Sequence, residues 1–177
     1  LQIGATTRAV AYTSGSGTAI LNFNYVVQAG DTTARLDYAS TNALVLNGAT
    51  IQDLSGNNAN LTLATPGATN SLGANKTIGL DTTVPTITIS APSSAATTVG
   101  PVVYTVDYAD ANFNASTLVA ANITLNKTGT AAATVLVTGT GTSRLVTLTN
   151  ITGSGTLGLS ITNGTASDLA GNTAPVG

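Results

Sequence analysis

Histidine, cysteine, methionine, tryptophan and glutamate are all absent from this chain of 177 residues. Without histidine, the Ser-His-Asp and Cys-His catalytic arrangements and histidine-ligated zinc sites are excluded. Without cysteine the chain forms neither a disulfide nor a reactive thiolate, which suits a secreted protein that folds without an oxidation step. The remaining residue types show no catalytic arrangement, and we therefore predict that the protein is not an enzyme.

Charged side chains are also scarce, with five lysines and arginines against seven acidic residues, all of them aspartate. So few basic residues provide no electrostatic footprint for nucleic acid. The three arginines, Arg8, Arg35 and Arg144, are expected to be solvated. No apolar run approaches the ~18 residues of a membrane-spanning helix, so membrane insertion is not expected. Hydrophobic residues still make up 42% of the chain, which argues against disorder.

The abundant residues are serine and threonine, 47 together, and glycine, 19. Threonine and valine favour strands, whereas glycine and asparagine favour turns. Apolar and polar residues alternate in several runs, as in Thr18–Val27, where Leu21, Phe23, Tyr25 and Val27 share the predicted core face. Glycine-rich segments between the runs are typical of hairpin turns, and no run has the period of a helix. The sequence therefore predicts an all-β, antiparallel sandwich.

An internal repeat divides the chain. Two pairs of segments share a pattern: 8–23 with 133–148, and 47–59 with 163–174. The second pair contains DLSGN at Asp53–Asn57 and DLAGN at Asp168–Asn172. Between the copies lies DTTVP at 81–85, whose proline cannot lie inside a central strand. We predict a first module over residues 1–80, a linker over 81–85 and a second module over 86–177.

These motifs also carry a resemblance. DTTVPT at Asp81–Thr86 precedes an alternating strand, and DLAGN lies near the end of the second module. In both respects the chain resembles the tandem immunoglobulin-like repeats of large bacterial cell-surface adhesins, in which D-x-A-G-N lies in the last hairpin and D-T-T-x-P-T links modules. The resemblance covers nearly the whole chain. It implies two tandem immunoglobulin-like antiparallel β-sandwiches from a secreted, extracellular protein.

The function that the resemblance implies is structural or adhesive: a stalk or fibre at the cell surface, stiffened by calcium. Its partners would be neighbouring repeats, copies of itself, or a ligand on a host or matrix surface. Two alternatives remain open. The chain could be the subunit of a self-assembling extracellular filament held by strand complementation, or a carbohydrate- or protein-binding module. The scarcity of aromatic residues argues against a sugar-binding platform.

Strand order predicts where the acidic residues gather. Strands of the second module are expected at 86–90, 102–108, 118–125, 132–138, 143–149, 156–162 and from 173. Because antiparallel strands alternate in direction, Asp107, Asp110 and Asp168 are expected at the pole that faces the linker residue Asp81. Converging carboxylates suit Ca²⁺, and we predict a calcium site at Asp81, Asp110 and Asp168, with Asp107 assisting. The alternative is that these aspartates only form Asx turns.

Asp31 and Asp37 of the first module are secondary candidates for calcium ligands. A further expectation concerns the last hairpin of each module. Gly56 and Gly171 are predicted to take a left-handed conformation that tightens the last hairpin.

Alignment of the glycine turns indicates that the first module lacks its N-terminal strands and that the second stops just into its last strand. We therefore expect residues outside this chain copy to cover the open edge and core face of the first module. The simplest such arrangement is a head-to-tail filament.

Overall fold

The computed structural model describes residues 1–177 and is nearly all β, with 36% strand and 4% helix in several antiparallel sheets. This confirms the predicted fold class. The chain divides into two compact units, Leu1–Thr82 and Thr83–Gly177, and this division falls within the predicted linker at 81–85. None of its helical turns has the length and hydrophobicity needed to cross a membrane.

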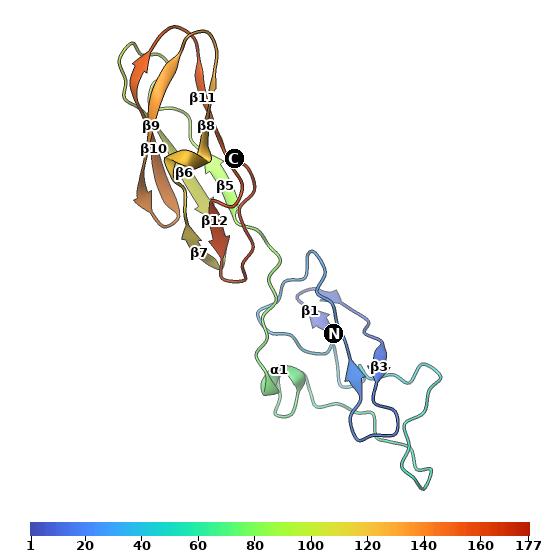
Figure 1. Ribbon diagram of the computed structural model, residues 1–177. Helices are drawn as coiled ribbons and strands as arrows, with labels where there is room; N and C mark the ends of the chain where they lie inside the picture. The colour runs from blue at the N-terminus through green and yellow to red at the C-terminus, as the bar shows by residue number, and fades with distance from the viewer. The chain divides into compact units, whose positions relative to one another are not determined.

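A four-stranded antiparallel sheet forms one layer of the second unit (Figure 1). Its strands lie in the order β5 (Thr86–Ile89), β6 (Val102–Ala109), β10 (Ser143–Thr152) and β9 (Ala132–Thr140). The alternation in sequence explains the layer, because every second residue of β6 is buried: Val102, Tyr104, Val106 and Tyr108. The residues between them face away from the core.

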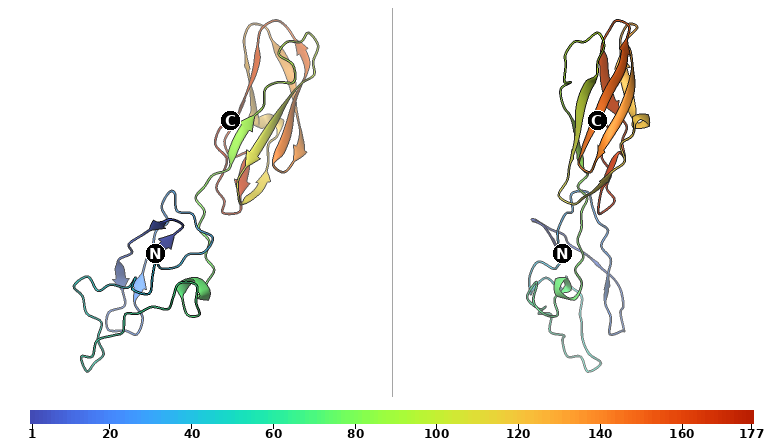
Figure 2. Two further views of the ribbon diagram at one scale, coloured as in Figure 1. Left: turned by 180° about the vertical axis from the view of Figure 1, so that it is seen from behind. Right: turned by 90° about the vertical axis from the view of Figure 1, so that its left-hand side faces the viewer.

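The facing layer is built from two strand pairs, β8 (Ile123–Lys127) with β11 (Leu157–Ile161), and β7 (Phe113–Ser116) with β12 (Ala166–Asp168). Backbone hydrogen bonds between Ile161 and Gly177, and between Ala166 and Ala174, add residues 173–177 to its edge. The core lies between the layers, where Val106, Val146 and Leu148 pack with Leu118 and Ile161. Figure 2 shows these layers of the second unit from two further sides.

One strand of the second unit differs from the prediction. Residues 118–125 were expected to form a single strand, but a 3₁₀ turn, η1 (Ala120–Asn122), precedes β8. The cause is local, since the Asn122 side chain accepts a hydrogen bond from the Val119 N–H while the Asn122 N–H donates to the Val119 carbonyl. Leu118, just before this turn, is fully buried in the core.

The first unit contains little regular structure. Its strands are β1 (Gln2–Ile3), β2 (Thr6–Thr7), β3 (Tyr12–Ser14) and β4 (Asn22–Phe23). The strand predicted over Thr18–Val27 is wrong in extent, because only two residues pair, and they pair with β3 alone. As a consequence the predicted core face is largely open: Leu21, Phe23 and Val27 are 37%, 44% and 45% exposed.

The first unit also contains a one-turn helix that the sequence pattern did not predict, α1 (Leu72–Asn75). The Ser71 side chain caps it by accepting a hydrogen bond from the Ala74 N–H. Ile3 is the one hydrophobic side chain of this unit that belongs to the buried set. The unit therefore holds its shape mainly through polar contacts.

Candidate functional site

The repeated DL(S/A)GN turn is the first component of the candidate site. In the second unit both carboxylate oxygens of Asp168 accept from Asn172, one from its backbone N–H at 2.8 Å and one from its side-chain amide at 2.7 Å. The Asp168 N–H in turn donates to the Asn172 carbonyl. The aspartate therefore closes its own hairpin, and it does so while only 2% exposed.

The first unit repeats the same geometry at an exposed position. The Asp53 carboxylate accepts from the backbone and the side chain of Asn57 and also from the Ser55 N–H. The side-chain amide of Asn57 lowers the pKa of Asp53 most, followed by the Asn57 backbone N–H. Gly56 and Gly171 have φ values of +84° and +92°, which confirms the predicted left-handed conformation in both turns.

The loop after β6 supplies the second component. Asp110 forms an Asx turn by accepting from the Asn112 N–H at 2.7 Å. The Asn112 carbonyl accepts from the Leu169 N–H, which ties this loop to the DLAGN turn. Carboxylate oxygens of Asp110 and Asp168 consequently lie within 4.8 Å of one another, although their residues are far apart in the sequence.

The predicted ligand set also contains Asp107 and Asp81. Asp107 is exposed on β6 between the buried residues Val106 and Tyr108, so its side chain points to the outer face of the sheet. Its carboxylate is not grouped with those of Asp110 and Asp168. Asp81 is the second-last residue of the first unit, in the segment that runs on into β5.

Asp31, a secondary candidate, is occupied by protein donors. Its fully buried carboxylate accepts from the Arg8 guanidinium at 2.9 Å, from the Tyr25 hydroxyl and from the Gln28 N–H. The Tyr25 hydrogen bond is the largest influence that holds the pKa of Asp31 below its ordinary value, against the opposing effect of burial. Asp31 therefore ties Arg8, near the start of the first unit, to the segment 25–31.

Asp37, the other secondary candidate, has a similar structural role. Its carboxylate accepts from the N–H groups of Tyr38 and Gly67. Burial alone would raise the pKa of Asp37, but the backbone donors, Gly67 first, outweigh it and lower the pKa. A side chain at Gly73 would begin 2.8 Å from this carboxylate, so the glycine is what lets α1 approach it.

Two arginines contradict the expectation that they are solvated. Arg8 pairs with Asp31, and Arg144 reaches from β10 to the facing layer, where it donates to the carbonyls of Ser116 and Leu118. Arg144 Nε is buried without a partner in the protein. The sequence pattern did indicate that Arg144 faces the core, because Arg144 lies on the same side of the alternating strand as Val146 and Leu148.

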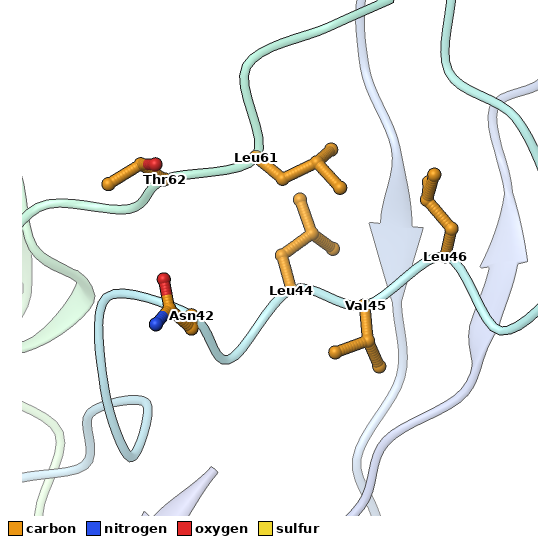
Figure 3. Close-up of a pocket in the computed structure, with 6 residues that line it drawn as sticks. All are labelled: Asn42, Leu44, Val45, Leu46, Leu61 and Thr62. Atoms are coloured by element: carbon orange, nitrogen blue, oxygen red, sulfur yellow. The ribbon is translucent and has the colours of Figure 1, made fainter.

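The first unit also has an open apolar groove, which we call the first-unit groove. Two adjoining hollows of about 560 and 410 Å³ share one wall, residues 44–46. Figure 3 shows Leu44 and Leu61 pointing toward one another, while Val45 points away. Tyr12, Leu21 and Phe23 of the hairpin line the larger hollow, and no charged residue lines either one.

No family model, no curated protein and no solved structure matches this chain.

Proposed function

We propose that this chain is a structural repeat segment of a secreted bacterial cell-surface protein, in which immunoglobulin-like modules form a stalk or adhesive fibre. The observation that carries the proposal is the path of the chain through the second unit. β5 begins beside Ala109, at the pole that holds Asp110 and Asp168, and residues 173–177 run from that pole toward the opposite one. A chain that enters at one end and leaves toward the other suits modules strung in series.

Strand order supports the immunoglobulin-like part of the proposal. The sheet order β5-β6-β10-β9 corresponds to strands A, B, E and D of a constant-type immunoglobulin domain. The facing layer corresponds to strands C, F and G, with C interrupted by η1 and G formed by 173–177. The sandwich lacks the disulfide of antibody domains, so its stability depends on the apolar core and on Arg144 between the layers.

Calcium binding at the linker pole belongs to this proposal. Asp110 and Asp168 bring two carboxylates within 4.8 Å, a separation at which a divalent cation would relieve their repulsion. Asp168 already accepts two hydrogen bonds, but a carboxylate has about four acceptor sites and can also bind an ion. Asp81 is five residues before Thr86, the residue that pairs with Ala109, and we expect it to be the third ligand.

The calcium test compares two aspartates that have the same turn chemistry. Calcium should release or absorb heat on titration into the chain and raise its melting temperature relative to chelator, by linkage. Asp110→Ala and Asp168→Ala should abolish the calcium-dependent increment, whereas Asp53→Ala should preserve it. The readout is the difference in melting temperature between calcium and chelator for each variant, because Asp168→Ala also breaks a turn and so lowers stability without calcium. Identical melting and no heat in calcium and chelator would exclude the site while leaving the stalk proposal intact.

A second candidate function, the strand-complemented filament, is favoured by the first-unit groove. In the second unit, β10 pairs with β9 on one side and β6 on the other, and β6 helps to cover the core. In the first unit, β4 pairs only with β3, and the apolar residues of this hairpin line an open groove. The covering element would be an extended segment with alternating apolar residues, like β6, contributed by another copy.

Light scattering coupled to size exclusion distinguishes the two functions. A filament subunit should form larger species as the concentration rises, and Phe23→Asp should return it to monomer. The matched control is Leu136→Asp, because Leu136 is 52% exposed on β9 and lies outside the groove. A chain that stays monomeric at every concentration excludes the filament and favours the stalk.

A further inference from the structure

Each unit contains one Asn-Gly pair at the equivalent position of the repeat, Asn47–Gly48 and Asn163–Gly164. Asn-Gly is the dipeptide most open to intramolecular attack on the asparagine amide, because glycine has no side chain to hinder its own backbone nitrogen. Asparagine is accordingly among the thermally labile residues. The two pairs therefore share the same intrinsic chemistry and differ in their conformation and surroundings.

Hydrogen bonding of the glycine nitrogen distinguishes the two pairs. The Gly164 N–H donates to the Ala174 carbonyl at 2.8 Å, which anchors it to the last strand of the sandwich. The Gly48 N–H makes no hydrogen bond within the protein. Steric crowding does not distinguish the two glycines, since a Cβ added at either one would meet nothing within 4 Å.

The turn around Asn47 is exposed and lightly held. It is closed by one backbone bond, from the Ala49 N–H to the Leu46 carbonyl at 2.9 Å. Asn47 and Gly48 have φ values of +47° and +87°, so the asparagine itself is in the left-handed region that most residues avoid. Both Asn-Gly pairs are exposed, but the residues that follow them differ: Ala49 and Thr50 are exposed, whereas Thr165 and Ala166 are buried.

We propose that Asn47 is a site of spontaneous deamidation and that the fold protects Asn163 from the same reaction. The Gly48 nitrogen loses its proton and attacks Cγ of Asn47, forming a C–N bond. The bond from Cγ to the amide nitrogen breaks, and ammonia leaves with the proton. Water then opens the five-membered imide at either carbonyl and yields aspartate or isoaspartate at position 47.

The modification would change the charge of a surface that is otherwise neutral. Asn47 lines the larger hollow of the first-unit groove, whose other lining residues are all uncharged. Conversion replaces a neutral amide by a carboxylate there and, in the isoaspartate product, lengthens the backbone by one carbon inside a four-residue turn. Older copies of the chain would thus present a different groove rim from newly made copies.

Peptide mapping by mass spectrometry tests the proposal on the whole chain, aged at mildly alkaline pH in native buffer and, in parallel, in denaturant. Asn47 should convert many-fold faster than Asn163 in native buffer, with isoaspartate among the products. In denaturant the two rates should become similar, because only the fold separates the sites. Equal rates in native buffer would overturn the proposal. A ratio that persists in denaturant would also overturn it, since the difference would then come from neighbouring sequence.

Discussion

The two units begin from similar sequence patterns and arrive at different structures. Each has a glycine-rich hairpin and a DL(S/A)GN turn, but only the second unit encloses a hydrophobic core. Its hairpin, β9–β10, pairs along most of its length and is flanked by β6. The corresponding β3–β4 hairpin of the first unit has no such flanking strand. An alternating pattern therefore becomes a long strand only where another strand covers its edge.

The DL(S/A)GN turns, in contrast, have the same structure in both units. Asp53 and Asp168 each accept from the backbone and side chain of an asparagine four residues later, and the glycines just before these asparagines have nearly the same φ. Asp53 is exposed and Asp168 is buried, yet both aspartates accept the same two hydrogen bonds from their asparagine. This geometry is determined by its five residues and needs no tertiary support.

The two units are stabilised internally by different kinds of interaction. The second unit depends on apolar packing between its layers, whereas the first depends on buried carboxylates that collect donors from distant segments. Asp31 connects Arg8, Tyr25 and Gln28, and Asp37 connects Tyr38 and Gly67. Substitutions in the two units should therefore have effects of very different size.

Truncating the core should give the largest effect. Leu148→Ala removes a side chain that is 1% exposed and should lower the free energy of unfolding of the second unit by about 2–5 kcal/mol. Phe23→Ala, at the similar hairpin position of the first unit, should cost less than about 1 kcal/mol because Phe23 already contacts solvent. Hydrogen exchange read by peptide reports each unit separately. Equal losses in both units would show that the first unit has a core of its own.

Adding a side chain at the turn glycines should reduce stability by a smaller amount. Gly171→Val places a β-branched residue at φ +92° and should destabilise the second unit by about 1–2 kcal/mol through backbone strain alone. Gly56→Val strains its turn equally but should raise exchange only near that turn, because little else is packed against it. Ala170→Val and Ser55→Val are the matched controls, since neither position has a positive φ. A loss as large in the controls would mean that strain is not the cause.

Much of the second unit could be predicted from alternation. The expected strands at 86–90, 102–108, 132–138, 143–149 and 156–162 correspond closely to β5, β6, β9, β10 and β11. The strand directions also placed Asp110 and Asp168 at one pole, where the structure brings them together. These predictions succeeded because period-two patterns and strand reversal are local properties of the chain.

The failures come from interactions that a pattern does not contain. The strand over Thr18–Val27 needed a partner beyond β3, and the break before β8 needed one specific side-chain bond from Asn122. Arg144 was misjudged because arginine is usually solvated, although its position on the core face argued otherwise. Pairing distant residues such as Arg8 and Asp31 requires the folded path of the chain.

Acidification should give the smallest and most selective effect. The fold lowers the pKa of Asp31, chiefly through the Tyr25 hydroxyl, and so favours the ionised form. Its contribution to stability is therefore complete above the pKa of an unfolded aspartate and is lost as the pH falls through the lower folded pKa. Hydrogen exchange around residues 8, 25 and 31, corrected for its intrinsic pH dependence, should accelerate over that acidic range.

Asp31→Asn is the variant that separates this carboxylate from the other acids of the first unit. It should lose protection already at neutral pH, because an amide cannot replace the ion pair with Arg8, and it should lose most of the acid-dependent step. Asp53→Asn is the control, since the pKa of Asp53 is also lowered but its partners all lie within its own turn. If hydrogen exchange around Tyr25 still accelerates equally on acidification in Asp31→Asn, another group is titrating. Asp37 would then be the carboxylate whose ionisation stabilises the first unit.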